Sequence, residues 1–319
     1  MKKFKSLLIV ASIVATISCS NDDNTTTTPQ SNSLADVIEN NSSLNSLEAA
    51  LKKVNLFETL KGDVNFTIFA PTDEAFADFL SSNGFSSLEQ VPNEALTQIL
   101  LNHVLGTKVP SNQVATGYVS TLAKGGASAT NELSLYINVS NSGVVLNGTS
   151  TVTSYDLNAS NGVIHIVDSV IGLPTIVTHA LANPDLSILV SALTRDDQPN
   201  FVGILSGTES SPFTVFAPTN QAFVNLLSEL ELSSLGDVPQ EVLENTLKYH
   251  VVAGANVLSS DLTNNMNVIT FQGDSFVVSL SNGAKIIDAN NRESNIILTD
   301  IQTANGVIHV LDKVILPSL

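Results

Sequence analysis

The sequence predicts an α+β fold that occurs twice along the chain, and three observations support this prediction. The segment FTIFAPTDEAF, which begins at Phe66, returns as FTVFAPTNQAF at Phe213. The segment NGVIHIVDSVI, which begins at Asn161, returns as NGVIHVLDKVI at Asn305. Within each copy, apolar residues at helical spacing give way to short alternating strands. The repeat period of roughly 145 residues is longer than that of solenoids and propellers, so each copy is a whole domain.

Each copy is expected to begin with helices. In the first copy, Ser33 is a candidate N-cap, and apolar residues follow it at intervals of three or four: Leu44, Leu47, Leu51, Val54 and Phe57. The second copy has a comparable apolar stripe between Ile176 and Leu193. A second helical region is predicted over residues 94–104, and its counterpart over residues 241–252.

The first repeated segment predicts a strand that turns into a helix. The strand ends at a proline, and Thr72 is placed to cap the helix that follows. Thr219 has the same place in the second copy, whereas the acidic pair at 73–74 becomes Asn220–Gln221. Because both charges vanish while the hydrophobic frame persists, we interpret Thr72 and Thr219 as structural residues and exclude a catalytic carboxylate at this corner.

Short strands are predicted in the second half of each copy, joined by turns such as Asn-Gly and Ser-Gly. They are LSLYINV, GVVLN and TVTSYDL in the first copy and VITF, SFVVSL, AKII and NIILT in the second. The repeated NGVIH strand closes each copy and is followed by a proline. These landmarks place a domain boundary near Pro174, with a first domain over residues 34–174 and a second over residues 175–319.

The N-terminus has the features of a secretion signal followed by a lipid anchor. Residues 1–18 join a basic start to an apolar stretch that is too short to span a bilayer. Cys19, the only cysteine, follows directly, and residues 16–19 resemble the lipobox of bacterial lipoproteins. We therefore expect a lipid on Cys19 that attaches the protein to a membrane. The alternative is an ordinary signal cleavage next to an incidental cysteine.

Residues 19–33 are predicted to form a flexible polar tether, because they lack apolar periodicity. The pair Asp22–Asp23 resembles the surface-export signal of lipoproteins in Bacteroidetes-type bacteria. The predicted localisation is an outer-membrane lipoprotein displayed at the cell surface. If the acidic pair is only part of a spacer, the domains face the periplasm instead.

Composition and histidine spacing exclude several kinds of partner. Acidic residues outnumber basic ones 30 to 13, so the chain lacks the concentrated basic surface that nucleic acid requires. The recurring histidines have no metal-ligand spacing and are interpreted as structural: His103, His165, His250 and His309. A zinc site would need two of them to meet a carboxylate such as Asp168. We predict no metal, no cofactor, no catalytic residue and no enzymatic activity, because nucleotide-binding and nucleophile motifs are also missing.

The ordered motifs resemble those of fasciclin domains, once in each half. These motifs are the early F-T-[IV]-F-A-P-T block, the central histidine and the late N-G-V-I-H block, from about Ser33 onward. The resemblance implies a compact domain in which a β-wedge or sandwich packs against several helices. It also implies a role in extracellular adhesion and matrix interaction rather than in catalysis.

Two adhesion elements of the family carry over by position. The Asp-Ile element, which the resemblance assigns to integrin contact in animal relatives, corresponds to Asp300–Ile301 and to Asp156–Leu157. The Tyr-His element corresponds to Tyr249–His250, whereas the first copy has Asn102–His103. The alternative interpretation is structural inheritance, because an aspartate at a strand entry often caps a turn.

The sequence therefore predicts a lipid-anchored envelope protein that mediates adhesion or extracellular matrix interaction through two fasciclin-like domains. The expected partner is a protein or polysaccharide at the cell surface, and tandem display favours a repetitive target. We expect contact through exposed loops and sheet edges rather than a deep pocket. One alternative is a polysaccharide-binding accessory protein. Another is a metal-dependent hydrolase, which would require polar groups that converge in a concave site.

Overall fold

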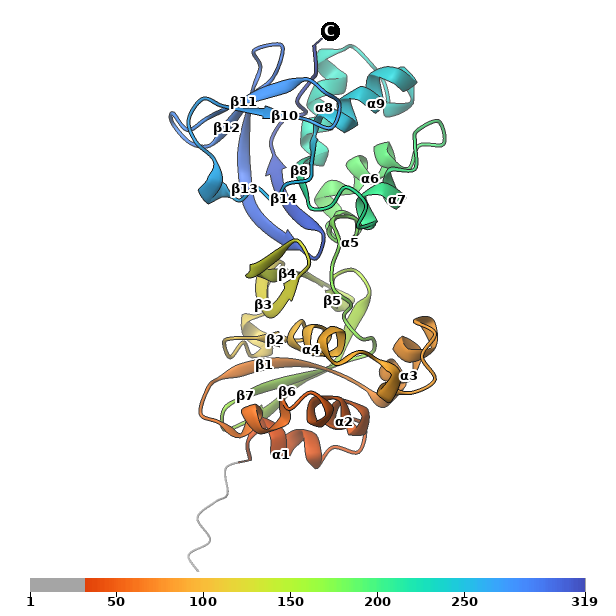
Figure 1. Cartoon of the computed structure of the whole chain (residues 1–319), viewed down its shortest axis with the longest axis vertical. Coiled ribbons are helices and arrows are strands. Elements are labelled where there is room, and N and C mark those ends of the chain that lie inside the picture. Colours follow the sequence, from red (N-terminus) through yellow and green to blue (C-terminus); the bar gives the residue numbers. More distant parts are fainter. Residues whose placement is uncertain (1–31, 319) are drawn as a thin grey trace, which may run out of the picture. The chain divides into compact units, whose positions relative to one another are not determined.

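The computed structural model describes residues 32–318. The predicted signal, Cys19 and most of the tether therefore lie outside the described residues. Two seven-stranded sheets, each with its own helices, make up the described part of the chain (Figure 1). The α+β class predicted from the sequence is confirmed.

The first sheet has the strand order β2-β1-β7-β6-β5-β4-β3. Its strands are β1 (Phe66–Pro71), β2 (Val104–Leu105), β3 (Gly117–Gly125), β4 (Ser128–Ser140), β5 (Gly143–Leu146), β6 (Ser150–Ala159) and β7 (Gly162–Val167). The helices of this half are α1 (Leu34–Glu39), α2 (Asn45–Lys53), α3 (Asp73–Ser82) and α4 (Asn93–Leu101). Short 3-10 turns join them: η1 (Phe57–Lys61), η2 (Leu88–Gln90) and η3 (Ser111–Gln113).

The second sheet repeats this order strand for strand. Its strands are β8 (Phe213–Pro218), β9 (Val251–Ala253), β10 (Met266–Ile269), β11 (Ser275–Ser279), β12 (Lys285–Ile287), β13 (Glu293–Thr303) and β14 (Gly306–Leu311). The helices are α5 (Ile176–Ala182), α6 (Ser187–Leu193), α7 (Phe201–Ser206), α8 (Asn220–Glu229) and α9 (Gln240–Tyr249). The 3-10 turns are η4 (Pro184–Leu186), η5 (Leu235–Asp237) and η6 (Ser259–Asp261).

The two repeated sequence segments of each half are neighbouring parallel strands. Phe69 of β1 lies opposite His165 of β7, and Phe216 of β8 lies opposite His309 of β14. The remaining pairings within each sheet are antiparallel. Strands that are covered on both faces need nearly continuous apolar sequence, which explains why these two segments are so alike in the two halves.

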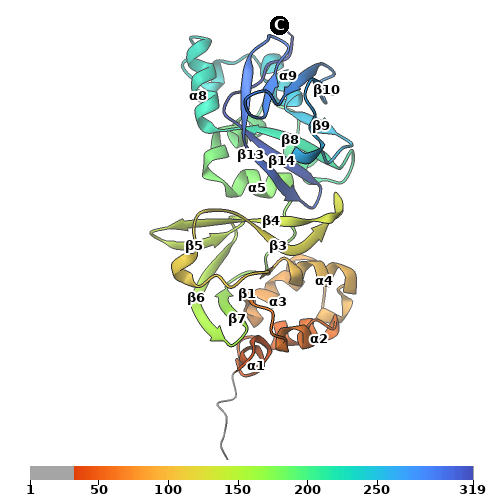
Figure 2. The ribbon, with the colours of Figure 1, turned by 90° about the vertical axis from the view of Figure 1, so that its left-hand side faces the viewer.

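The central strands of each half separate two apolar clusters. In β1, Ile68 and Ala70 pack with the helices, whereas Phe69 packs with apolar residues of β4, β5 and β6. Phe216 of β8 likewise packs with residues of the antiparallel strands, on the face away from Val215. Figure 2 shows helices α5 and α8 on one side of strands β8 and β14. Because successive side chains of a strand point to opposite faces, one face of the central strands packs against helices and the other packs inside a β-wedge.

The second helical region of each half ends earlier than predicted. Helices α4 and α9 end before a histidine, and the short strands β2 and β9 begin directly after it. His103 Nδ1 donates to the carbonyl oxygen of Ile99 at 2.7 Å, and His250 Nδ1 does the same to Thr246 at 2.7 Å. The carbonyl of His103 then accepts a hydrogen bond from Phe69 in β1. The histidine side chain thus binds a carbonyl group of the last helical turn, and the chain continues from the helix directly into a strand of the sheet.

Strand β3 was not predicted, and β4 and β13 are longer than the apolar segments that signalled them. Their additional residues are mostly polar and therefore lack apolar alternation: those of β4 are mostly exposed, whereas Gln302 and Thr303 at the end of β13 are buried. None of the described helices is by itself long and apolar enough to cross a bilayer. Helix α5 taken with η4 and α6 passes that test only as a pair broken by 103°, on length and composition alone.

Candidate functional site

The aspartate of each candidate adhesion element occupies a bulge in a strand. Asp156 in β6 and Asp300 in β13 have φ angles of 59° and 60°, next to breaks in the register with the following strand. The Asp156 carboxylate accepts hydrogen bonds from the backbone N–H of Ser111, at 2.9 Å, and from its hydroxyl. The Asp300 carboxylate binds Ser259 in the same way, with 2.7 Å to the N–H. Each aspartate thus caps the 3-10 turn that begins at the serine.

A histidine completes this cluster in each half. His165 Nε2 donates to the Val109 carbonyl at 3.0 Å, and His309 Nε2 donates to that of Val257 at 2.9 Å. Their Nδ1 atoms accept from the backbone N–H of Asp156 and Asp300, at 3.3 and 3.4 Å. Both ring nitrogens are therefore engaged with the backbone. The imidazoles also lie against Phe69 and Phe216, with ring centroids 5.7 and 5.3 Å apart.

The repeated Ser, His and Asp do not have the geometry of a catalytic triad. A triad needs a hydroxyl that donates to the imidazole, and an imidazole that donates to the carboxylate. Here the hydroxyl of Ser111 donates to Asp156, and His165 accepts from a backbone N–H. These hydrogen bonds from Ser111 hold the pKa of Asp156 below its usual range. The cluster organises the backbone between a strand and a turn.

The Tyr-His element lies inside the second domain. Tyr249 is completely buried; its hydroxyl donates to the Ser275 carbonyl at 2.9 Å and accepts from the Ala289 N–H at 3.1 Å. Burial raises the pKa of Tyr249 to about 12. In the first domain Asn102 replaces it, and its Nδ2 donates to the Gly172 carbonyl at 3.0 Å. At equivalent positions, the hydroxyl of Tyr249 and the side-chain amide of Asn102 thus both form hydrogen bonds with the backbone.

The histidines beside these residues hold the closing segment of each domain. His103 Nε2 accepts from the Ile171 N–H at 2.8 Å, and His250 Nε2 accepts from the Ile315 N–H at 3.1 Å. Together with the bonds at Nδ1, these contacts fix the neutral tautomer with the proton on Nδ1. Burial lowers the pKa of both His103 and His250 to about 4.

The structure thus places the candidate adhesion residues in internal contacts. Ile301, Tyr249 and His250 are 1%, 0% and 3% exposed, whereas Asp156, Leu157 and Asp300 are half-buried. A role of these residues in adhesion stays a prediction. Of the six, only the three half-buried residues present any surface to a partner without rearrangement.

The caps predicted at the strand-to-helix corners are present. Thr72 Oγ1 accepts from the Ala75 N–H at 3.2 Å, and Thr219 Oγ1 accepts from the Ala222 N–H at 3.2 Å. The next residue of each helix accepts from the backbone of a neighbouring helix: Asp73 from the Ser46 N–H at 2.6 Å, and Asn220 from the Ile188 N–H at 2.8 Å. Asn220 accepts this hydrogen bond through an amide oxygen, as Asp73 does through a carboxylate oxygen. The contact therefore does not require the negative charge of Asp73.

The asparagine of the Asn-Gly pair is a residue whose function the sequence analysis missed. Asn161 Oδ1 accepts from the Leu34 N–H at 2.8 Å, and its Nδ2 donates to the Leu60 carbonyl at 2.8 Å. Asn305 binds Ile176 and Leu205 in the same way, at 3.0 and 2.8 Å. The recurrence of NGVIH was the available signal, but Asn-Gly was interpreted only as a turn. His179 was also passed over; it is buried, and its pKa is lowered to about 3.

Within residues 32–318, no three His, Cys, Asp or Glu side chains come together in a way that could hold a metal ion. In the hypothetical zinc site, the nitrogens of His103 and His165 contact backbone groups. The Asp168 carboxylate accepts from the Thr151 N–H at 2.7 Å. The sequence-based alternative of a zinc site built from these residues is therefore not formed.

The fold and the repeated Asp, Ser and His cluster define a modular protein in which one α+β unit occurs twice. The fasciclin domain family model matches residues 42–174 and 184–317, and the chain belongs to this family. The fasciclin resemblance found in the sequence is thereby confirmed for both halves.

Several curated proteins and solved structures are similar to this chain. Human periostin is 31% identical over 82% of this chain and 29% of its own length. The transforming growth factor-beta-induced protein ig-h3 of Sus scrofa is 27% identical over 81% of this chain and 35% of its own length. The Synechocystis protein sll1735 is 35% identical over 45% of this chain and 98% of its own length. This chain therefore spans about a third of the two animal relatives.

One of the similar solved structures is a FAS1 domain pair from the insect cell adhesion molecule Fasciclin I. It is 22% identical to this chain, with a TM-score of 0.48, and the alignment covers 89% of this chain and 94% of that one.

Proposed function

We propose that this protein is a lipid-anchored adhesion protein of the bacterial envelope that binds a surface or matrix protein through the second of its two fasciclin domains. Membership of the fasciclin family in both halves supports an adhesion-type function. The polar groups that recur in the two halves are engaged in backbone contacts, so they support architecture rather than chemistry. The predicted lipid on Cys19 would hold the domains at a membrane.

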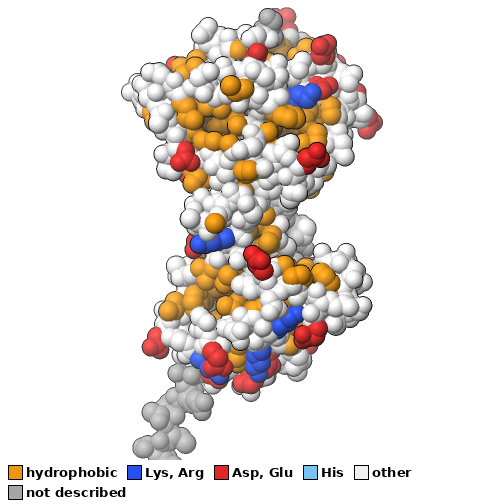
Figure 3. Space-filling model, in the orientation of Figure 1, with side chains coloured by type: hydrophobic (Ala, Val, Ile, Leu, Met, Phe, Trp, Pro, Cys, Tyr) orange, Lys and Arg blue, Asp and Glu red, His pale blue; other side chains and the backbone are white. Residues whose placement is uncertain are grey.

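One observation carries the assignment to the second domain, and it concerns the exposed residues of its sheet. Large apolar side chains are exposed on its strands and the adjoining turns: Ile269, Phe271, Leu280, Ile297 and Leu298. Ile269, on the edge strand β10, is 68% exposed, and Ile297 is 55% exposed. Figure 3 shows hydrophobic side chains gathered over strand β13 of this sheet. Large apolar residues exposed on one sheet favour a surface that binds another protein.

The test is a binding screen of the full chain carrying Cys19→Ala against matrix proteins and glycans. We expect saturable binding to a protein, and loss of at least tenfold in affinity in the double variant Ile269→Asp with Ile297→Asp. Val64→Asp is the matched control, because Val64 is 60% exposed in the first domain. Binding to glycans alone would favour the polysaccharide-binding alternative. Binding that the double variant leaves unchanged would refute the assignment to the second sheet.

A further inference from the structure

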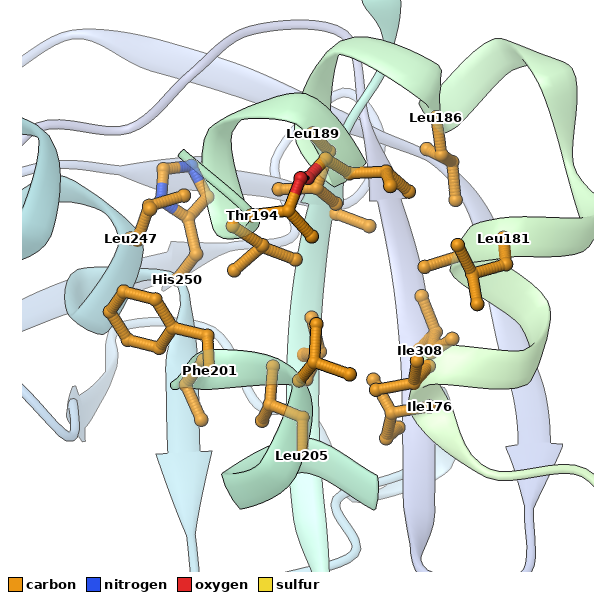
Figure 4. Close-up of a pocket in the computed structure, with 18 of the residues that line it drawn as sticks. Ile176, Leu181, Leu186, Leu189, Thr194, Phe201, Leu205, Leu247, His250 and Ile308 are labelled. Carbon is orange, nitrogen blue, oxygen red and sulfur yellow. The ribbon is translucent and has the colours of Figure 1, made fainter. Parts of the chain in front are cut away.

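We propose that the second domain, but not the first, contains a binding site for one unbranched aliphatic chain, such as the acyl chain of a lipid or a free fatty acid. The site is a pocket between helices α5, α6 and α7 whose floor is formed by strands β8 and β14. Figure 4 shows the labelled side chains arranged around this space, among them Leu181, Phe201 and Ile308. This proposal is independent of the adhesive surface on the second sheet.

The lining of the pocket offers no free hydrogen-bonding group. Its residues are apolar except for Thr194 and His250. The Thr194 hydroxyl donates to the Val190 carbonyl at 2.9 Å, and both ring nitrogens of His250 are bonded to backbone groups. A ligand with polar groups along its length would lose its hydrogen bonds to water here without replacement, which selects a hydrocarbon.

The volume of the pocket further restricts the ligand. The cavity has a volume of about 30 Å³. A water-sized group needs roughly 10–15 Å³ by this measure, so the cavity holds about two such groups. This is room for the end of an unbranched chain and not for a ring. A peptide would also bring backbone polar groups into a lining whose own polar groups are already bonded, so we infer a hydrocarbon chain rather than a protein segment.

The first domain can be compared with the second at the position of this pocket, because equivalent hydrogen bonds hold the surrounding helices in both domains. Leu34 and Ile176 are bound by the equivalent Asn161 and Asn305. Ser46 and Ile188 donate to equivalent residues of the next helix. Lys53 Nζ donates to the carbonyls of Leu88 and Val91, and Arg195 donates to those of Leu235 and Val238. These contacts fix the correspondence of α1 and α2 with α5 and α6. The carbonyls of Leu60 and Leu205, which accept from Asn161 and Asn305, fix it for the end of η1 and of α7.

In the first domain, charged residues cover the region that corresponds to the pocket. The ring of Phe57 is 3% exposed, and the ammonium groups of Lys52 and Lys61 lie 4.7 and 5.3 Å from its centroid. Lys52 forms ion pairs with Glu48 and, at 3.6 Å, with Glu39. Lys61 pairs with Glu58 at 2.8 Å. An aromatic ring beneath a charged network leaves no apolar entrance.

In the second domain, every one of these charges is absent. The positions of the charged residues are taken by Leu181 for Glu39, Val190 for Glu48, Thr194 for Lys52, Gly203 for Glu58 and Ser206 for Lys61. The buried ring at the start of this element is kept, as Phe201, whereas Val202 beside it is 36% exposed and Leu181 is 64% exposed at the entrance. The absence of these five charges makes the entrance of the pocket apolar. This difference favours an aliphatic ligand, whose polar end would stay in solvent.

The test uses the full chain carrying Cys19→Ala, so that no lipid of its own competes. The fluorescent probe is cis-parinaric acid, an unbranched fatty acid. We expect saturable binding of one probe per chain, displaced by hexadecanoic acid and not by adamantane carboxylic acid. Leu181→Glu with Thr194→Lys restores two charges of the first domain and should weaken binding at least tenfold without changing the melting temperature, because Leu181 is exposed.

The matched control is Glu39→Leu with Lys52→Thr in the first domain, which should leave probe affinity unchanged. Sedimentation with phosphatidylethanolamine and phosphatidylglycerol vesicles distinguishes a membrane lipid from a free fatty acid as the source of the bound chain. Vesicle binding that Leu181→Glu abolishes identifies membrane lipid, and probe binding without vesicle binding identifies free fatty acid. Absence of saturable binding overturns the proposal, as does binding that the paired variant does not affect. Self-association that Leu181→Glu abolishes, without probe binding, would identify a second copy of the chain as the occupant instead.

Discussion

Asp300 accepts hydrogen bonds from both the backbone N–H and the hydroxyl of Ser259, and this pair joins strand β13 to the turn η6. The same relationship recurs between Asp156 and Ser111 in the first domain. An element that the family resemblance assigns to adhesion therefore has a structural function in this chain.

Replacement of Asp300 separates these two functions. Asp300→Ala should lower the free energy of unfolding by about 2–4 kcal/mol, because it removes charge-assisted hydrogen bonds and places alanine at positive φ. Asp300→Asn keeps an acceptor oxygen and a residue that tolerates this φ, so it should cost less. Urea unfolding measures both changes. If Asp300→Asn folds normally yet loses all ligand binding, the aspartate contacts the partner directly.

The central aromatic residues should be among the most sensitive positions. Phe69 and Phe216 are each 1% exposed and lie between the central strands and the wedge. Phe69→Ala or Phe216→Ala should cost about 3–5 kcal/mol, because each leaves a cavity in a packed core. Thermal and urea unfolding provide the measurement. A loss below about 1 kcal/mol would contradict the packing described for these strands.

Acid should destabilise the protein through its buried histidines. The pKa of His103 and of His250 falls to about 4 in the folded chain, from an ordinary value near 6.5. Below about pH 6.5 the unfolded chain binds more protons, so stability falls as the pH drops from 6.5 toward 4. At pH 5 each histidine should have cost about 2 kcal/mol relative to pH 7.5. Equal unfolding free energies at pH 7.5 and 5 would show that these imidazoles are not buried in the neutral form.

The lipid anchor is tested in cells. Cys19→Ala removes the only thiol of the chain, so the protein should move from the membrane fraction to the soluble fraction. Fractionation followed by immunoblotting measures this change, with Ser20→Ala as a matched control. Continued membrane association of the Cys19→Ala protein would contradict lipidation at this position.

The duplication made most of the fold accessible from sequence, because each copy tests the interpretation of the other. The loss of both charges at Asp73 and Glu74 in the second copy correctly indicated a structural corner at Thr72. Strand β3 was missed because its two buried residues are Thr121 and Ala123, so its sequence lacks a strong apolar alternation. The function of Asn161 escaped because its partners, Leu34 and Leu60, lie about 100 residues or more away in sequence. The pocket of the second domain was missed because the charges that it lacks are spread over five separate positions, and only the matched contacts of the two domains show which residues correspond.

The most direct test of the adhesion proposal is adhesion by cells that display the intact protein. Cells carrying the wild-type chain should bind a surface coated with the protein identified in the screen, and Val64→Asp should leave this binding unchanged. Cells with Ile269→Asp and Ile297→Asp, at equal display, should lose most of it, because charge is introduced on the exposed apolar side of the second sheet. Undiminished adhesion by the double variant would contradict the proposal.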